Sequence, residues 1–483
     1  MTQSHSDLIL KARPYQKKAI EEVRSLFASG KKRVLLQLAT GAGKTFVFSC
    51  ILQMAQKRNV KSIMVVRGRA LVDQASRRLE EHGIDHSVFM AGDKRYNKES
   101  LIQIVSVDTC ISRKEFPEAE LVIIDEAHTA TSESFTKFLS NYQDAFWLSV
   151  TATPWTKEGL KCIADDVVYP VSIKQLVDDG YLVPPKIYIA STFDTSGLKM
   201  QGGDYSEATA LDAFNKQGIY GDVVGNYMQH CADEYTWVYA INIDHAVNLS
   251  EKFEDAGFNT VIITGETPIF ERTKLLEENK LVISIGTLTT GVDLPKLRNL
   301  IICRPTRSRN LYVQMLGRGT RPYPGKEYFR VFDHVGNYRE FGNILHETVA
   351  DLEPAQKSPA RSKLDSDPQL KACPSCNFGV HPATKECPEC GHAFKITAIK
   401  VVKNDVMIEV KDDEQAEFAF KIMGMFETCL NKGYKIGYVW HKANEAFGMD
   451  GVKKMSTIYW RIHNIYKKKI HQRDSQTVIY GRY

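Results

Sequence analysis

Residues 33–45 read RVLLQLATGAGKT, an apolar run followed by a glycine-rich turn. Together with the apolar, helix-compatible segment after it, this stretch predicts a strand, a loop and a helix in the order of a phosphate-binding loop. Gly41 and Gly43 let backbone N–H groups approach phosphate oxygens. Lys44 offers a point charge to the β- and γ-phosphates, and Thr45 offers a hydroxyl to Mg²⁺. The stretch therefore predicts an α/β domain that binds a nucleoside triphosphate, such as ATP, with Mg²⁺.

The loop departs from the strict GxxxxGK[ST] pattern because Leu38 stands where the first glycine would be. The alternative interpretation of this stretch is a glycine turn that only starts a helix.

An acidic motif further along the chain supports the phosphate-binding interpretation. Residues 121–128 read LVIIDEAH, so Asp125 and Glu126 directly follow a buried strand. Ligands of open α/β sheets bind at the carboxyl ends of the strands. We expect Asp125 to hold Mg²⁺ through its water shell and Glu126 to orient and deprotonate an attacking water, and the alternative is a solvated acidic turn.

Alternating apolar runs and amphipathic stretches continue along the chain. Five such runs occur before residue 190 and five more between residues 236 and 334, which predicts two tandem α/β domains with parallel sheets. The expected division of the 483 residues is a first domain at 1–190, a linker or accessory insertion at 191–225, a second domain at 226–345, a linker at 346–370, a cysteine module at 371–395 and a basic, mostly helical tail at 396–483.

Composition excludes several classes of protein. Hydrophobic residues make up 43% and charged residues 25% of the chain, which is ordinary for a folded protein and excludes a disordered or collagen-like one. The apolar runs fall far short of the ~18 residues that span a bilayer, and the N-terminus lacks a secretory apolar segment. We therefore expect no membrane partner and a cytoplasmic location, in a bacterial or phage-infected cell. The net charge of +5 is uneven, because residues 421–483 carry +8, which leaves −3 for the rest and predicts a polyanion partner for the tail.

Four of the ten cysteines form two C-x₂-C pairs separated by ten residues. The pairs are Cys373 with Cys376 and Cys387 with Cys390. Four thiolates at this spacing satisfy the tetrahedral coordination of Zn²⁺, so we predict a structural zinc site. Disulfides, which are disfavoured in a cytosolic chain, and an iron–sulfur cluster are the alternatives.

The order and residues of these motifs resemble those of the DEAD/DEAH-box-like superfamily-2 helicases over about residues 13–321. The further segments that carry the resemblance are RPYQ at 13–16, SVTATP at 149–154, TTGVD at 289–293 and QMLGRGTR at 314–321. The resemblance implies two RecA-like domains of the P-loop NTPase class. It also implies an enzyme that couples ATP hydrolysis to movement on nucleic acid.

The resemblance assigns roles to single residues as well. It implies that Gln16 contacts adenine and that Gly291 and Asp293 face the nucleotide. The residues that it implicates in coupling hydrolysis to nucleic acid are His128, Thr151, Thr153, Gln314, Arg67, Arg69 and Thr109. Taken alone, the two arginines of the first domain are equally well explained as solvated surface charges.

Arg318 and Arg321 lie in the segment that resembles the arginine fingers of this family. Phosphoryl transfer spreads negative charge over the equatorial oxygens, and a guanidinium from a second domain accelerates it by a factor on the order of 10³ to 10⁵. Because they are three residues apart, we expect the two arginines to share one helical face, and a surface arginine pair is the alternative. ATP bound between the domains would close the cleft, and product release would open it.

The tail interleaves aromatic and basic residues. Tyr434, Trp440, Tyr459, Trp460 and Tyr466 alternate with lysines and arginine. Aromatic side chains offer stacking platforms for bases and lysines neutralise phosphates, whereas a small helical core with a solvated lysine face is the alternative. Helicase core, cysteine pairs and tail together resemble the RadD family of bacterial DNA-repair helicases. That resemblance implies single-stranded, forked or branched DNA as the partner, together with single-strand-binding or recombination proteins.

The sequence thus predicts a superfamily-2 DNA helicase or translocase that acts in DNA repair or recombination and uses ATP, Mg²⁺ and Zn²⁺. An RNA helicase is one alternative, because DNA and RNA members share the DEAH residues. The motor subunit of a restriction-type nuclease complex is another, although no PD…ExK-like cluster appears outside the motor. The residues Lys44, Glu126 and Arg321 argue against a binding module without catalysis.

Overall fold

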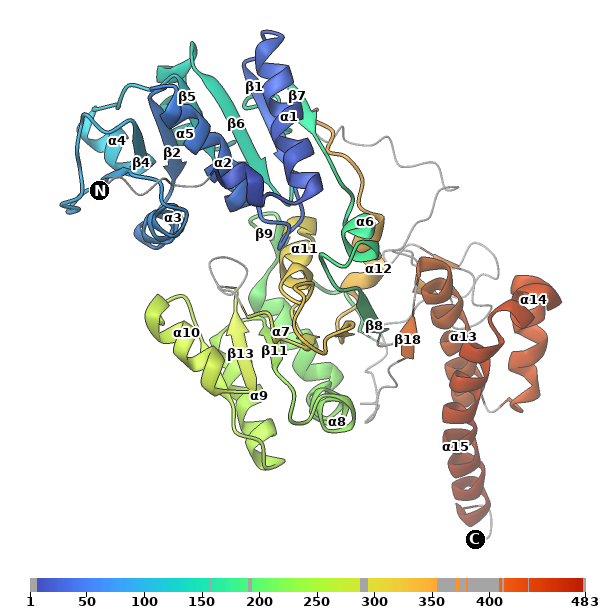
Figure 1. The fold of residues 1–483 in the computed structure, drawn as a ribbon. Helices are drawn as coiled ribbons and strands as arrows, with labels where there is room; N and C mark the ends of the chain where they lie inside the picture. Colours follow the sequence, from blue (N-terminus) through green and yellow to red (C-terminus); the bar gives the residue numbers. More distant parts are fainter. Residues whose placement is uncertain are drawn as a thin grey trace.

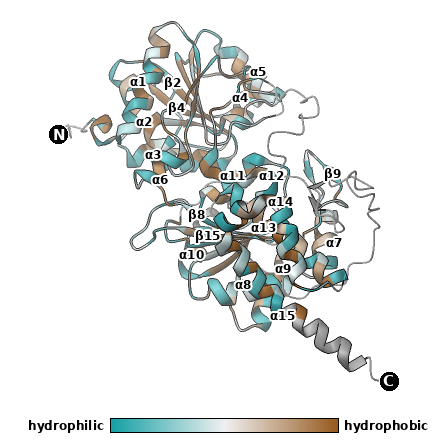
Figure 2. Cartoon of the chain, turned by 90° about the vertical axis from the view of Figure 1, so that its right-hand side faces the viewer, coloured by the Kyte–Doolittle hydropathy of each residue, from teal (hydrophilic) through white to brown (hydrophobic). Residues whose placement is uncertain are grey.

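The computed structural model describes residues 7–156, 158–189, 193–286, 294–353, 371–372, 379–380, 408–410, 412–432 and 434–480. Two α/β domains lie one above the other, and a group of C-terminal helices lies beside the second domain (Figure 1). The strands of both domains lie between helices, several of which alternate hydrophilic and hydrophobic colours (Figure 2). The expected pair of parallel-sheet α/β domains is confirmed.

The first domain is built on a seven-stranded parallel sheet with the order β3-β4-β2-β5-β6-β1-β7. Strands in its middle are buried on both faces, which explains why they read as continuous apolar runs. The strands are β1 Arg33–Gln37, β2 Ser62–Val66, β3 Ser87–Phe89, β4 Ile102–Ser106, β5 Leu121–Ile124, β6 Phe146–Thr151 and β7 Asp166–Val168. The helices are η1 Leu8–Lys11, α1 Pro14–Ala28, α2 Lys44–Lys57, α3 Arg69–Glu81, α4 Val107–Arg113, η2 Ala127–Thr129, α5 Glu133–Leu139, η3 Ser140–Tyr142 and α6 Ile173–Asp178.

The second domain has a seven-stranded sheet with the order β12-β13-β11-β14-β15-β8-β18, parallel except for β18. Its strands are β8 Pro185–Ile189, β11 Thr236–Ala240, β12 Val261–Ile263, β13 Leu281–Ile285, β14 Asn299–Ile302, β15 Phe329–Asp333 and β18 Ile408–Val410. The other elements are the hairpin β9 Met200–Gln201 and β10 Asp204–Tyr205, with α7 Glu207–Gln217, α8 Tyr220–His230, α9 Ile243–Asp255, α10 Ile269–Glu278, α11 Arg309–Gly317, α12 Asn337–Phe341 and η5 Ile344–His346.

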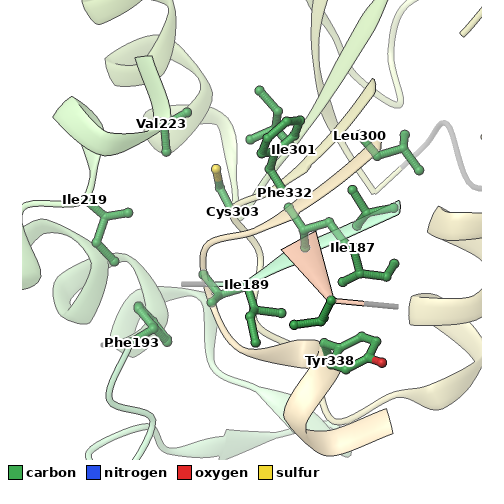
Figure 3. Packing of buried hydrophobic residues seen from close by; sticks show 14 of the residues in the cluster. Ile187, Ile189, Phe193, Ile219, Val223, Leu300, Ile301, Cys303, Phe332 and Tyr338 are labelled. Carbon is green, nitrogen blue, oxygen red and sulfur yellow. The ribbon is translucent and has the colours of Figure 1, made fainter. Parts of the chain in front are cut away.

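The boundary between the domains lies earlier than the expected residue 190. Strand β8 pairs in parallel with β15, and Tyr188 stacks on Phe332 with 4.7 Å between the ring centroids. Ile187 and Ile189 of β8 point into the core of the second domain (Figure 3). This pairing joins residues far apart in the sequence, so the apolar run of β8 does not reveal to which sheet it belongs.

The expected linker at 191–225 is also part of the second domain from residue 193 onward. It contains the β9–β10 hairpin, helix α7 and the start of α8. Phe193, Ile219 and Val223 point into the same core as the strands of the second sheet (Figure 3). Because the segment is rich in polar residues, its overall composition does not indicate that these apolar side chains belong to a core.

The described part of the C-terminal region consists of strand β18 followed by three helices, α13 Asp413–Lys432, α14 Gly437–Lys454 and α15 Ser456–Tyr480. Strand β18 extends the second sheet by pairing antiparallel with β8. The Arg339 guanidinium of α12 lies 3.9 Å from the ring centroid of Phe420 on α13. The tail therefore packs on the second domain and shares its hydrophobic core.

The cysteine module and one helicase motif fall largely outside the described residues. Around the cysteines, only the short antiparallel strands β16 Lys371–Ala372 and β17 Gly379–Val380 are described. Cys373, Cys376, Cys387 and Cys390 lie outside the described residues, as do Gly291 and Asp293. Among the helices that the structure describes, none combines the length and the apolar character that a bilayer crossing requires.

Candidate active site

The glycine-rich loop connects β1 to α2 at the carboxyl end of the first sheet. Gly41 and Gly43 have φ angles of 85° and 81°, which side chains rarely adopt. A Cβ at Gly43 would also lie 2.5 Å from the side-chain nitrogen of Gln16. Helix α2 begins at Lys44, so its first-turn N–H groups face the loop. This arrangement fits the anion site that the sequence predicts, and the binding of phosphate there stays a prediction.

The RPYQ segment at the start of α1 supports this loop. The Gln16 side-chain amide donates to the Ala42 carbonyl at 3.0 Å, and its oxygen accepts from the Arg13 backbone N–H at 3.0 Å. The Tyr15 hydroxyl donates to the same Ala42 carbonyl at 2.9 Å. In the structure Gln16 is therefore a positioning residue of the loop, and its contact with adenine stays a prediction.

The acidic pair follows β5 at the same edge of the sheet. Glu126 has a φ of 47°, a left-handed conformation that is uncommon for a non-glycine residue, and its N–H donates to the Asp125 carboxylate at 2.9 Å. Burial and the Glu126 charge raise the pKa of Asp125, and the Lys44 charge opposes this shift. One Glu126 carboxylate oxygen is buried and accepts no hydrogen bond from the described residues. This set of buried oxygens beside a lysine fits a Mg²⁺ ion, its water ligands and an attacking water.

His128 joins both domains in one polar network. Its Nδ1 lies 3.1 Å from the Thr151 hydroxyl and 3.3 Å from the Thr153 hydroxyl. Its Nε2 lies 3.4 Å from the side-chain nitrogen of Gln314 on α11, and the same nitrogen donates to Thr153 at 3.3 Å. Burial lowers the pKa of His128, which favours a neutral ring that accepts at Nε2 and donates at Nδ1. Four of the residues implicated in coupling are thus brought together.

Arg318 and Arg321 do not share a helical face as expected, because α11 ends at Gly317. A Cβ at Gly319 would lie 2.2 Å from the Phe329 ring, and Pro322 disfavours the helical conformation at Arg321. Arg318 is the C-cap residue, and Arg321 lies in the loop after it.

Both arginines nevertheless lie close to residues of the first domain. The Cγ of Arg321 lies 3.4 Å from where a Cβ of Gly41 would be. Burial lowers the pKa of Arg321 to about 10. Burial also lowers the pKa of Arg318, and the charge of Glu126 opposes that shift. Arg321 therefore lies beside the phosphate loop, and Arg318 lies within electrostatic reach of Glu126 in the acidic pair.

Residues that the motifs do not reveal hold this interface together. A Cβ at Gly317 would lie 2.7 Å from the Thr40 Cβ, so only glycine lets α11 approach the loop so closely. Asn310 donates to the Trp155 carbonyl at 2.7 Å, and the Arg309 guanidinium lies 4.3 Å from the centroid of the Trp155 ring. Sequence spacing gives no signal for contacts between residues this far apart.

Lys326 is a further residue that sequence reasoning missed. Its ammonium group donates to the Arg321 carbonyl at 2.9 Å and to the Pro295 carbonyl at 3.1 Å. The residue is 5% exposed, and burial lowers its pKa to about 7. Lys326 therefore positions the backbone of Arg321 from within the second domain.

Arg67, Arg69 and Thr109 make contacts within the first domain. Arg67 donates to the Ser134 hydroxyl at 2.7 Å and pairs with Asp108 at 3.3 Å. Arg69 donates to the Ala91 carbonyl at 2.8 Å, and the Thr109 hydroxyl accepts from the Ala91 N–H at 3.0 Å. These contacts join segments that follow β2, β3, β4 and β5 at the carboxyl edge of the sheet, and the contact of the three residues with nucleic acid stays a prediction.

Residues 343–353, which we call the return segment, lead back from the second domain to the first. The Gln37 side chain of β1 donates to the Thr348 carbonyl at 3.1 Å and accepts from the Ala350 N–H at 2.7 Å. The Leu352 carbonyl accepts from the Leu160 N–H at 2.8 Å. The return segment therefore links the two domains in addition to the contacts that Gln314, Gly317 and Arg321 make with the first domain.

A buried carboxyl in the return segment predicts a pH dependence of stability. Burial raises the pKa of Glu347 from 4.5 to about 8, and the Arg309 charge opposes this shift. Between those values the folded chain binds more protons than the unfolded chain, so stability is greatest below the unfolded pKa and falls as the pH rises through the folded pKa. Glu347→Gln should reduce the fall in urea-unfolding free energy between about pH 5 and pH 9. Glu353→Gln, an exposed acid of the same segment, is the control, and an identical pH slope in wild type and Glu347→Gln would contradict the assignment.

The comparisons with known proteins agree with this site. Residues 9–156 match the family described as type III restriction enzyme, res subunit, and residues 226–322 match the helicase conserved C-terminal domain. The chain therefore carries the paired RecA-like domains of a superfamily-2 helicase. Its enzyme class is that of a nucleic-acid-dependent ATPase.

Individual relatives share parts of this organisation. A 51.5 kDa protein of a Lactococcus phage is 27% identical over 422 residues, which cover 85% of this chain and 89% of the relative. IRC3 of Saccharomyces cerevisiae, whose description proposes an ATP-dependent helicase, is 28% identical over 67% of this chain and 51% of its own length. The type ISP restriction-modification enzyme LlaBIII, in a structure bound to DNA, shares the fold with a TM-score of 0.52 and 20% identity, over 66% of this chain and 27% of that one. The chain thus spans only about half of the yeast relative and about a quarter of the restriction enzyme.

Proposed function

We propose that the protein is an ATP-dependent DNA translocase or helicase that remodels DNA in repair or recombination. The observation that carries the proposal is the contact between the two domains at the phosphate loop. Arg321 lies beside Gly41 of that loop, and the Gln314 side chain lies next to His128 across the same interface. Hydrolysis of a nucleotide held there changes contacts of both domains at once. Such a change can alternately open and close the cleft, which is what a motor on a nucleic-acid strand requires.

The residues divide the chemistry among them. The backbone N–H groups at the start of α2, with Lys44, bind the phosphates, while Thr45 and Asp125 hold Mg²⁺. Mg²⁺ neutralises charge on the β- and γ-phosphates when bound. Glu126, aimed by its left-handed backbone, takes the proton of the attacking water. Arg318 and Arg321 stabilise the charge that develops in the transition state.

The choice of DNA as the polymer rests on three kinds of support. The res-subunit match and the DNA-bound LlaBIII neighbour both come from restriction enzymes. The RadD-like combination of helicase core, cysteine pairs and basic tail favours repair over restriction.

We also propose that Cys373, Cys376, Cys387 and Cys390 bind one Zn²⁺ per chain, which elemental analysis of the purified protein would count. A cytoplasmic location accords with these assignments.

The rate of ATP hydrolysis with different polymers tests the proposal. Single-stranded DNA, duplex DNA, forked DNA and RNA of matched length should be compared at saturating concentration. We expect DNA to stimulate hydrolysis more than RNA, with no stimulation in Lys44→Ala. Stimulation by RNA alone would replace the proposal by the RNA-helicase alternative, and no stimulation by any polymer would overturn both.

A restriction-type motor subunit is the second candidate, because residues 9–156 match a restriction-enzyme subunit. In this role the chain would need a partner for cleavage, because no PD…ExK-like cluster appears outside the motor. Strong stimulation by duplex DNA, with little effect of single strands or forks, would favour this candidate over a repair helicase.

A further inference from the structure

The C-terminal helices contain two classes of aromatic residue that the structure separates. Tyr459, Tyr466 and Phe426 are buried and build the small core of the tail, so this part of the core alternative is correct. Trp440 and Trp460 are 39% and 49% exposed, although tryptophan side chains are highly buried on average. A packing role explains the buried residues and leaves the exposed tryptophans unexplained.

The two exposed indoles lie together. Trp440 comes from α14 and Trp460 from α15, and their ring centroids lie 6.2 Å apart with an interplanar angle of 27°. Buried Tyr459 meets both edge-on, at 5.1 Å from Trp440 and 5.4 Å from Trp460. His463 meets Trp460 edge-on at 4.9 Å. Contacts with Tyr459 and His463 therefore hold the two indoles in place, so that little side-chain entropy is lost when a planar ligand packs on them.

The surroundings of the pair favour an anionic ligand. Lys467 lies seven residues after Trp460, on the same face of α15, and is exposed. Arg461 is exposed beside it, and neither cation forms an ion pair with another described residue. The sequence from Trp460 to Lys469 contains no acidic residue. On α14, Glu445 is already paired with Lys442 at 2.5 Å.

We propose that Trp440 and Trp460 form a stacking platform for unpaired bases of a single nucleic-acid strand, whose phosphates Arg461 and Lys467 contact. The inference rests on the proposed function, because it names the form of nucleic acid that the tail holds. Bases in a duplex already stack on their neighbours and present only edges, whereas an unpaired base offers its π-face. The platform therefore selects single strands, such as those at a fork or gap, and is tolerant of sequence.

The test compares variants of the full chain in nucleotide-free binding to labelled oligo(dT) and to a duplex of the same length. Trp460→Ala and Trp440→Ala should weaken oligo(dT) binding by about 5- to 150-fold, which corresponds to ~1–3 kcal/mol per stacked base. Duplex affinity should stay the same, and so should the salt dependence of oligo(dT) binding, because no phosphate contact is lost. Trp460→Phe should restore part of the affinity. Met449→Ala, which removes an apolar side chain that is 63% exposed on α14, is the matched control.

The outcomes separate this inference from the proposed function. Unchanged oligo(dT) affinity in both alanine variants would overturn the platform, and so would equal losses for oligo(dT) and duplex. In that case the indoles serve another partner, such as a protein. Should the wild-type chain bind no nucleic acid at all, the proposed function itself fails. Maximal ATP hydrolysis at saturating DNA should be the same in Trp460→Ala and wild type, because the platform lies outside the nucleotide site.

Discussion

Glu126→Gln is expected to reduce the rate of ATP hydrolysis by about 10²- to 10⁴-fold, the usual contribution of a general base, while ATP still binds. Glutamine keeps the size and shape of the side chain but cannot take a proton from water. Because the phosphate loop and Lys44 remain, the variant should hold ATP and accumulate in the closed form. Steady-state hydrolysis and equilibrium ATP binding, measured on the same preparation with DNA present, give the two quantities.

Two comparison variants make this prediction specific. Lys44→Ala should also stop turnover, but by weakening nucleotide binding, because it removes the charge beside the phosphates. Glu133→Gln, which changes an exposed acid at the start of α5, should behave as wild type. Normal turnover in Glu126→Gln would overturn the assignment of the acidic pair.

Arg321→Ala is expected to reduce kcat by a factor on the order of 10³ to 10⁵ with little change in the affinity for ATP, because the guanidinium acts on charge that develops in the transition state. Arg321→Lys should recover little, since an ammonium group lacks the planar fork of donors. Arg318→Ala should also lower kcat, because Arg318 interacts electrostatically with Glu126. Stopped-flow binding of a fluorescent ATP analogue, beside steady-state kinetics, separates binding from chemistry.

A surface arginine provides the control. Arg307 pairs with Glu340 inside the second domain at 3.3 Å, so Arg307→Ala should leave kcat unchanged. Thermal unfolding of each variant shows whether a loss of rate comes from a loss of fold. If Arg321→Ala folds and turns over ATP at the wild-type rate, Arg321 is only a structural contact of the phosphate loop. It then supplies no catalytic charge from the second domain.

The sequence by itself was sufficient for features encoded locally. The glycines at 41 and 43 are needed wherever the backbone turns with positive φ, so their spacing before Lys44 identifies the loop without any tertiary contact. Asp125 and Glu126 follow a run that is buried on both faces, which places them at the carboxyl edge of a parallel sheet. These rules concern neighbours in the chain, and each was met.

Only the tertiary structure decided which distant residues meet. The sheet to which β8 belongs depends on pairing with β15, over a hundred residues later, and the phosphate loop meets Arg321 because Gly317 lets α11 approach Thr40. The end of α11 before Arg318 is likewise seen only in the folded structure, where Gly319 packs closely against Phe329.

The tail shows the same division between sequence and tertiary structure. Its composition predicts both a core and a binding surface, and the pattern of aromatic residues cannot tell them apart. Packing of α13, α14 and α15 buries Tyr459 and leaves Trp440 and Trp460 exposed. Local conformational rules determine the elements and the residues at their ends, whereas burial and contact arise from the sum of many weak long-range interactions, which no short stretch of sequence contains.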